Sequence, residues 1–217
     1  MGAKSRMKGE ITRHVNQFIK DECNSADGRY KSWEFCYLFF QKNFDKQDWD
    51  KAALMLAFYL ASWGMYRGSS FLLQYTYTIH IQALKIIFSP KYTELYHKIL
   101  TDDKDISLLF QLIKELKDYY FIKQRKIRPN IAVSNLVSDT LISKILLGTL
   151  GNIPAYDRFV KIGLKKSNLL QTMSPKGYKQ LVNFYKQNQE EIDSLQQKYC
   201  IYPPMKILDM YFWGLGQ

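Results

Sequence analysis

The stretch "DISLLFQLIKELKDYYFIKQRK" (residues 105–126) has apolar side chains at positions 106, 109, 110, 113, 116 and 120. Spacings of three and four residues place these side chains on one face of a helix with 3.6 residues per turn. The stretch therefore predicts a long amphipathic helix that buries one face. The same spacing recurs in residues 10–22 and 134–151, so the helix is the expected building element of the chain.

The amino-acid composition also favours a helical fold. Of the 217 residues, 47% are hydrophobic and 15% aromatic, which is enough apolar surface to form a buried core. The chain has 11 Gly and 6 Pro, too few for a turn-rich β-sandwich or a low-complexity chain. We predict an all-α fold as a single globular multi-helix domain over 1–217. The pattern allows two lobes, 1–118 and 119–217, with a cleft between them.

Turn and capping signals divide the chain into segments that end at Gly, Pro and Asp-Gly positions. An Asp-rich first turn suits the helix that begins near residue 48, and Gly151 is placed to act as a left-handed cap. Gly64 and Gly68 frame a corner between two helices. The expected helical segments are 10–22, 33–44, 48–66, 70–88, 90–100, 105–126, 134–151, 155–166, 174–199 and 203–214.

Several classes of protein lack support in the sequence. The three cysteines are far apart and form no CxxC pair, so we expect neither disulfides nor a zinc site and assign the chain to the reducing cytoplasm. The N-terminus has no signal-peptide pattern, and the apolar run 52–66 is shorter than the roughly 20 residues of a membrane span. No GxGxxG, Walker or HExxH motif is present, and the three histidines are scattered. We expect no cofactor, no metal and no membrane contact.

The formal net charge of +11 is concentrated in one third of the chain. Residues 119–189 contain twelve Lys and Arg but only two acids, whereas 1–118 carries a net +3 and 190–217 a net −2. Segregated positive charge favours a polyanionic partner because each bound phosphate releases counterions. Nucleic acid, with duplex DNA first, is the expected partner. The alternatives are a solvated surface, a protein-interaction domain with a basic face and, with less support, an anionic membrane surface.

Two aromatic stretches contain residues suited to binding a base. In "WGMYRGSSF" (63–71), Trp63 and Tyr66 could stack on a base, and Arg67 could contact a phosphate or an aromatic face. The alternative is a tightly packed helix corner. In "RYKSWEFCYLFF" (29–40), Tyr30 and Trp33 could line a pocket, although aromatic residues at helical spacing are more often part of a core.

The stretch "LLGTLGNIPAYDRFVKIG" (146–163) contains one acid, Asp157, at the expected start of a helix inside the basic region. The simplest interpretation is a helix N-cap, in which the carboxylate accepts hydrogen bonds from free backbone amides. A non-catalytic helical nucleic-acid-binding module with Asp157 as a cap is therefore one reading of the whole chain.

Residues 134–163 also resemble the core of the helix-hairpin-helix DNA glycosylases. "ISKILLGTLGNIPAYDRFVKIG" has, in order, the apolar helix, the turn with Gly and Pro, the Asp and the following "RFV" of that family. The resemblance implies that Asp157 is the catalytic carboxylate of base excision. It implies a pocket for the extruded base, for which the candidates are Tyr156, Trp63, Tyr66 and Arg67, and phosphate contacts, for which they are Lys144, Arg158, Lys161, Lys165 and Lys166.

The chain departs from the family pattern at two points. The segment "RPNIAVSNLVSD" (128–139), where the hairpin should lie, contains no glycine, so the usual phosphate clamp is absent or rebuilt. Asp139 occupies the place where bifunctional members carry a lysine nucleophile, and Lys144 lies only 13 residues before Asp157. The resemblance thus implies a monofunctional enzyme that leaves an abasic site. Both DNA and RNA fit as substrates, and both repair and defence against foreign DNA fit as settings.

Overall fold

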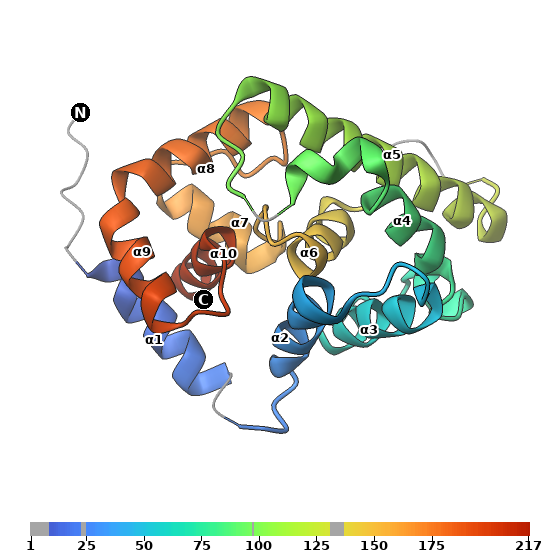
Figure 1. The fold of residues 1–217 in the computed structure, drawn as a ribbon, viewed down its shortest axis with the longest axis horizontal. Coiled ribbons are helices and arrows are strands. Elements are labelled where there is room, and N and C mark those ends of the chain that lie inside the picture. The colour runs from blue at the N-terminus through green and yellow to red at the C-terminus, as the bar shows by residue number, and fades with distance from the viewer. Residues whose placement is uncertain (1–8, 23–24, 97, 131–136) are drawn as a thin grey trace.

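In the computed structural model, residues 9–22, 25–96, 98–130 and 137–217 are described, and they form helices and connections with no β-strand among them (Figure 1). This confirms the all-α prediction. The helices are α1 (Glu10–Glu22), α2 (Lys31–Leu38), α3 (Trp49–Ser62), α4 (Ile79–Ile87), α5 (Asp103–Ile127), α6 (Asp139–Thr149), α7 (Arg158–Lys166), α8 (Pro175–Gln187), α9 (Gln189–Lys198) and α10 (Pro204–Gly216). A π-helical turn (Phe39–Asn43) and two 3-10 turns (Phe71–Gln74 and Pro90–Leu95) complete the described elements.

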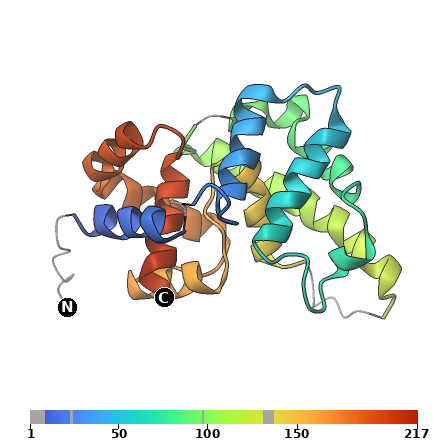
Figure 2. The same ribbon diagram turned by 90° about the horizontal axis from the view of Figure 1, so that it is seen from below.

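The helices lie in two adjacent groups (Figure 2). One group contains α1 and α7 to α10, with α10 packed against α7, α1 and α9. The other contains α2 to α5 and α6, and α6 contacts α2, α3 and α5. Position 118/119, which divides the chain by charge, falls inside the continuous helix α5. The N-terminal helix α1 lies across α10, so the grouping in space does not follow the order of the chain.

The apolar run 52–66 is mostly contained in α3, where Ala52, Leu56 and Leu60 are fully buried. Asp48 begins this helix, because its Oδ1 accepts a hydrogen bond from the Lys51 amide at 3.0 Å. Leu54 and Phe58 on the same helix are about half exposed, so the prediction of a buried helix is confirmed for one face only. No helix in the described ranges combines the length and apolarity needed to cross a bilayer.

The expected helix 70–88 is wrong, because the chain leaves helical geometry between the 3-10 turn and α4. Tyr75 is extended, with φ −129° and ψ 151°, and its hydroxyl donates to the Lys123 carbonyl on α5 at 2.8 Å. Thr76 and Thr78 share a side-chain hydrogen bond of 2.7 Å at the start of the next helix. Long-range hydrogen bonding and local hydroxyl contacts therefore override the helical period here.

Three other expected segments differ in the kind or number of elements that they form. Segment 90–100 forms only a 3-10 turn at Pro90–Leu95, and segment 33–44 passes from α2 into the π-helical turn. Segment 174–199 divides at Asn188, whose side chain donates to the Phe184 carbonyl at 2.7 Å, into α8 and α9. Gly151 has φ +68°, which confirms the predicted left-handed cap after α6.

Helices α7 and α10 are in contact through their backbones. A methyl group added at Gly163 would collide with the Phe212 carbonyl, and one added at Gly216 would collide with the Phe159 carbonyl. The absence of a side chain at these two glycines therefore allows the close approach. As a result, the start of α7, where Asp157 lies, is held firmly against α10.

Candidate functional site

The segment Gly151–Tyr156 is an irregular stretch of backbone in which every residue is buried. Buried polar backbone groups need partners, and side chains from three helices supply them. The Ala155 amide donates to Asp209 Oδ1 at 2.8 Å, and the Tyr156 amide donates to Ser143 Oγ at 2.8 Å. Thr140 Oγ1 donates to the Tyr156 carbonyl at 2.8 Å, and the Tyr178 hydroxyl donates to the Asn152 carbonyl at 2.9 Å. The residue that follows, Asp157, is thus carried on a well-anchored segment.

Asp157 is the N-cap of α7, as its position in the sequence predicts. Its Oδ1 accepts a hydrogen bond from the Val160 amide at 3.0 Å, and the side chain is 16% exposed. Burial raises the pKa of Asp157 above its usual value, and the negative charge of Asp209 raises it further. The Val160 amide and the cations Lys144 and Lys206 oppose that pKa shift. One carboxylate oxygen therefore caps the helix, while the other faces Lys144.

Lys144 does not occupy the surface position predicted for a phosphate contact, so that prediction is wrong. The residue is 5% exposed, and its Nζ donates to the Trp63 carbonyl at 3.0 Å. The same Nζ lies 3.9 Å from Asp157 Oδ2. Burial lowers the pKa of Lys144, whereas Asp157 acts to raise it. An amino group held in this way faces Asp157 and the Trp63 carbonyl, and not the solvent from which a phosphate would approach.

The contact between Lys144 and Asp157 was not expected from their separation of 13 residues in the sequence. Tyr156 hydrogen-bonds through its backbone to both Thr140 and Ser143, which are one turn or less from Lys144 on α6. The 151–156 segment therefore folds back along α6 and returns the chain to the level of Lys144. Counting residues along a straight helix could not anticipate this return.

A second buried ion pair, Lys206 and Asp209 on α10, lies nearby, and our reading of the sequence missed it. The two residues are 2% and 3% exposed, and Lys206 Nζ lies 2.8 Å from Asp209 Oδ2. The Lys206 ammonium also lies 4.8 Å from the centre of the Trp63 ring and 5.0 Å from that of Trp33. A signal was present, because "PPMKILDMYFWG" (203–214) has two opposite charges three residues apart in an otherwise apolar helix.

Trp63 is the aromatic residue at the centre of this charged group. Its ring centre lies 5.5 Å from Lys144 Nζ, and it forms the C-cap of α3. Its indole nitrogen is buried and has no hydrogen-bond partner within the described ranges. Arg67 lies over the Gly64 backbone, and its positive charge contributes to the lowered pKa of Lys144. Of the predicted pocket residues, the structure thus brings Trp63 and Arg67 close to Lys144.

Tyr66 takes part in a different contact. Its hydroxyl hydrogen-bonds to His80 Nε2 at 2.7 Å, and His80 Nδ1 hydrogen-bonds to the Tyr120 hydroxyl at 2.7 Å. Burial lowers the pKa of His80 to about 3, so the imidazole is neutral and can donate at one nitrogen and accept at the other. This chain of hydrogen bonds fixes the corner that carries Trp63 and Arg67.

Tyr156 is not available to a bound base, so its prediction as a pocket residue is wrong. It is fully buried, and burial raises the pKa of its hydroxyl. The cause is the extended backbone at Asp157 (φ −83°, ψ −178°), in which neighbouring side chains point to opposite sides. Asp157 reaches the surface, whereas Tyr156 points into the core.

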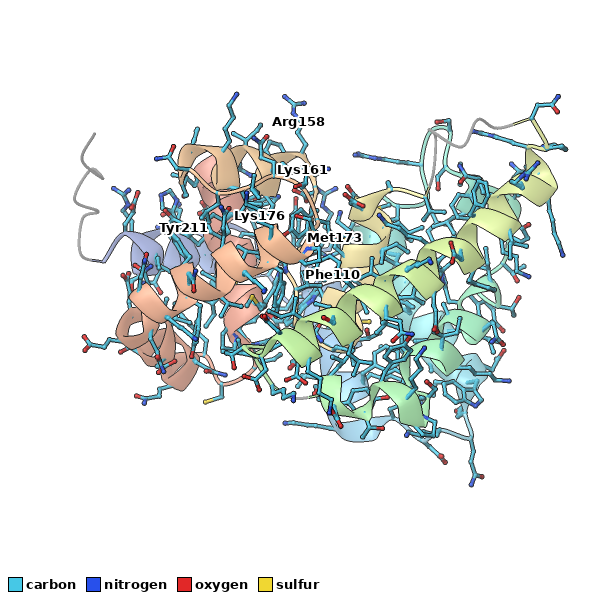
Figure 3. The ribbon with its side chains drawn as sticks, turned by 90° about the horizontal axis from the view of Figure 1, so that it is seen from above. Phe110, Arg158, Lys161, Met173, Lys176 and Tyr211 are labelled. Atoms are coloured by element: carbon cyan, nitrogen blue, oxygen red, sulfur yellow. The ribbon has the colours of Figure 1, made fainter. Side chains whose placement is uncertain are left out.

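The predicted phosphate-binding cations of α7 divide into two kinds. Arg158 and Lys165 are exposed and Lys161 is partly exposed, and Figure 3 shows Arg158 extending from α7 toward solvent. Lys166 is also exposed, but its Nζ donates to the Leu215 carbonyl at 2.8 Å and so caps the end of α10. Lys166 is therefore occupied by a backbone carbonyl of α10, whereas no such hydrogen bond holds Arg158, Lys161 or Lys165 in the described part of the chain. The missing-hairpin prediction concerns 128–139, of which 131–136 lie outside the described residues.

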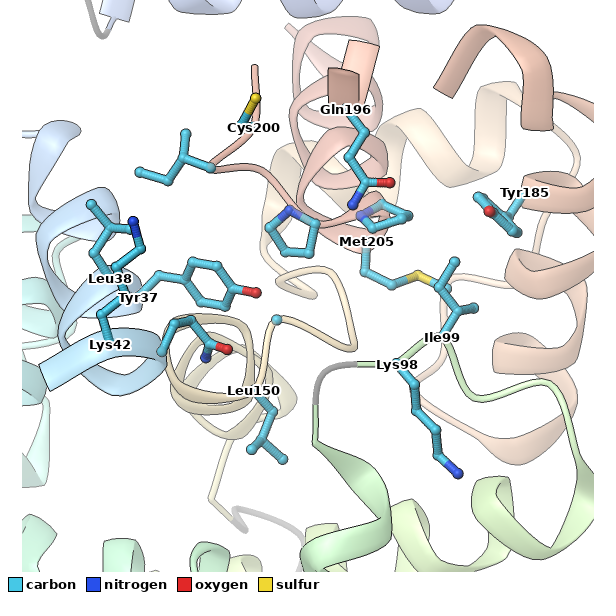
Figure 4. Close-up of a pocket in the computed structure, with 15 residues that line it drawn as sticks. Tyr37, Leu38, Lys42, Lys98, Ile99, Leu150, Tyr185, Gln196, Cys200 and Met205 are labelled. Carbon is cyan, nitrogen blue, oxygen red and sulfur yellow. The ribbon is translucent and has the colours of Figure 1, made fainter. Parts of the chain in front are cut away.

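A cavity of about 710 Å³ lies on another part of the molecule (Figure 4). None of the predicted site residues lines it. It reaches the first residue of the anchored segment, Gly151, and Tyr37, which stacks on Trp33 at 4.9 Å. The lining residues are Tyr37, Leu38, Gln41, Lys42, Lys98, Ile99, Leu150, Gly151, Tyr185, Gln196, Cys200, Ile201, Pro203, Pro204 and Met205.

Comparison with family models, with curated proteins and with solved structures found no match to this chain. The resemblance to the glycosylases therefore stays a prediction that rests on the residues themselves.

Proposed function

We propose that this protein is a monofunctional DNA glycosylase that hydrolyses the N-glycosidic bond of a modified or damaged base, with Asp157 as the catalytic carboxylate. The observation that supports it best is the environment of Asp157. The carboxylate is partly exposed, has a raised pKa, is carried on the anchored 151–156 segment, and lies beside Lys144. An Asp that only caps a helix does not need a buried lysine such as Lys144 beside its carboxylate.

The chemistry of N-glycoside hydrolysis suits a single carboxylate. Departure of the base develops positive charge on the sugar, and a nearby carboxylate stabilises that charge and orients or deprotonates the attacking water. A raised pKa brings the carboxylate closer to the working pH of a general base. Asp157 has the Oδ2 atom available for this role, because Oδ1 is engaged by Val160.

Lys144 supports the monofunctional form of the proposal. Its Nζ is buried and donates to the Trp63 carbonyl, so it is not directed toward a sugar carbon, although burial lowers the pKa of Lys144 and so favours the neutral amine that such an attack needs. Water is then the nucleophile. Lys144 Nζ lies 3.9 Å from Asp157 Oδ2 and only partly opposes the rise in the pKa of Asp157 that burial causes.

The cations of α7 would hold the DNA backbone next to this carboxylate. Arg158 immediately follows Asp157, and Lys161 and Lys165 continue along the same helix. Phosphates bind both to such side chains and to the N-terminal end of a helix. The competing proposal is a non-catalytic nucleic-acid-binding module, and the hydrogen bond between Asp157 and the Val160 amide favours it.

The test is single-turnover incubation with duplexes that each contain one modified base, followed by hot alkali to cleave abasic sites. The matched variant is Asp157→Asn, whose side-chain oxygen can still cap α7. Product from the wild type and none from the variant, with equal DNA affinity, supports the catalytic role. Equal product from both proteins rules out Asp157 as the catalytic group. Salt-dependent binding by both proteins, with no product on any duplex, favours the binding module.

A borohydride experiment tests the monofunctional assignment separately. Borohydride reduces a lysine–sugar imine to a stable covalent adduct, so a hydrolytic enzyme gives no adduct with its substrate. A protein–DNA adduct that disappears in Lys144→Met would show that Lys144 is a nucleophile and would refute water as the attacking group.

A further inference from the structure

The Ala155 amide lies two residues before Asp157 and depends on one side chain for its hydrogen bond. Asp209 Oδ1 accepts from this amide at 2.8 Å, and the Asp209 side chain is almost completely buried. Asp209 belongs to α10, which also packs directly against α7. Helix α10 thus contacts both the segment before Asp157 and helix α7, which Asp157 caps.

Lys206 holds Asp209 in place from one turn earlier on α10. Its Nζ lies 2.8 Å from Asp209 Oδ2, so the two oxygens of Asp209 have separate partners. Three aromatic rings surround the ammonium, with the centres of Trp63, Trp33 and Phe18 at 4.8, 5.0 and 5.3 Å. Cation–π attraction from these rings helps to fix Lys206, which is only 2% exposed.

A buried ion pair of this kind is a poor way to stabilise a fold, because desolvation of the two charges offsets their attraction. Apolar residues of similar size often stabilise such a place equally well. The Lys206–Asp209 pair therefore calls for a role other than stability. The hydrogen bond from the Ala155 amide to Asp209 indicates that this role is to hold the backbone before Asp157.

We propose that Asp209, oriented by Lys206, is a positioning residue that fixes the Ala155 backbone and thereby the place of the Asp157 carboxylate. The proposal rests on the proposed function, because Asp157 is taken as the catalytic group. Asp209 also contributes to the raised pKa of Asp157, which places its charge close to that carboxylate.

The experiment compares two double variants, both without the buried charges. Lys206→Met with Asp209→Leu removes the acceptor for the Ala155 amide, whereas Lys206→Met with Asp209→Asn keeps a carbonyl oxygen in that position. The control is Asp105→Asn, which removes the charge of a buried carboxylate on α5. Asp105 Oδ2 lies 2.7 Å from Lys98 Nζ. For each folded protein we measure the single-turnover rate, the DNA affinity and hydrogen exchange at the Ala155 amide.

The Leu double variant should lose about 100-fold in single-turnover rate with DNA affinity within twofold of the wild type, because a displacement of about 1 Å is enough for such a loss. The Ala155 amide should exchange at least about tenfold faster, as expected for a lost hydrogen bond. The Asn double variant should recover most of both losses, and Asp105→Asn should match the wild type. A merely structural role predicts equal rates for the two double variants, and that result would overturn the proposal.

Failure of the proposed function gives a different result. If the wild type cleaves no substrate, the ¹³C chemical shift and titration of the Asp157 carboxyl group replace the rate as the measurement. A change in the Leu double variant that the Asn double variant reverses supports the positioning role. Identical titration curves for both double variants overturn it.

Discussion

Replacement of Asp157 by Asn or by Ala separates its two roles by their effects on stability. The cap consists of one hydrogen bond, from the Val160 amide to Oδ1 at 3.0 Å. Asn keeps that acceptor and Ala removes it, so Asp157→Ala should be less stable than Asp157→Asn by about 1 kcal/mol. For a chain of this size that difference corresponds to about 2–4 °C in Tm.

The carboxylate charge adds a dependence on pH whose sign follows from its raised pKa. Burial raises the pKa of Asp157 in the folded protein above the ordinary value of 3.8, so the folded state binds a proton at a higher pH than the unfolded state does. Acidification therefore favours folding through this group, and the gain is complete below about pH 3.8 and lost as the pH rises through the folded pKa. Asp157→Asn has no such dependence and should be at least as stable as the wild type at pH 7.

The assay is urea denaturation followed by tryptophan fluorescence, at several pH values from 7 to 3.5, for the wild type and both variants. The free energy of unfolding of the wild type minus that of Asp157→Asn should increase on acidification. A difference that decreases would mean that the folded protein favours the ionised carboxylate, and a constant difference would mean that folding leaves the pKa of Asp157 unchanged; either result would refute the reasoning. Loss of base excision in both variants, whatever their stability, would assign the reaction to the carboxylate and not to the cap.

Three further predictions concern the surroundings of the site. Lys206→Met alone leaves the Asp209 charge buried without its partner and should lower the free energy of unfolding by about 3–5 kcal/mol in urea denaturation; a loss below about 1 kcal/mol would show that water reaches the pair. Gly163→Ala places a methyl group against the α10 backbone and should cost at least about 1–3 kcal/mol, whereas Gly214→Ala on α10 meets only a side chain and should be tolerated. Equal midpoints for these two variants in thermal denaturation would contradict the close packing of α7 on α10. Arg158→Ala should reduce the slope of log Kd against log salt for duplex DNA by about 1, and an unchanged slope in a salt titration would remove this residue from the phosphate contacts.

The cavity at the far end of the 151–156 segment has a different character from the Asp157 site. Its lining includes Ile201, Pro203 and Met205, with Lys42 and Lys98 among the few charged groups. Lys98 is already paired with Asp105 at 2.7 Å. The Asp157 site therefore does not coincide with this cavity, and the base pocket that the resemblance implies is not the one lined by these residues.

The sequence by itself determined those features that arise from interactions within a few residues. The helical periods, the start of a helix near the Asp-rich residues 48–50, the left-handed Gly151 and the cap at Asp157 each depend on local backbone geometry and short-range hydrogen bonds, and each was predicted. The failure at 70–88 shows the limit of this reasoning, because Tyr75 finds its partner on α5.

Tertiary structure alone decided which of these residues meet. The return of the 151–156 segment along α6 brings Lys144 to Asp157 and turns Tyr156 into the core, and the crossing of α10 places Lys206 and Asp209 beside them. Spacing within one helix indicates which face is buried and, for Lys206 and Asp209, which two charges can pair, but it does not indicate which distant helix packs against that face.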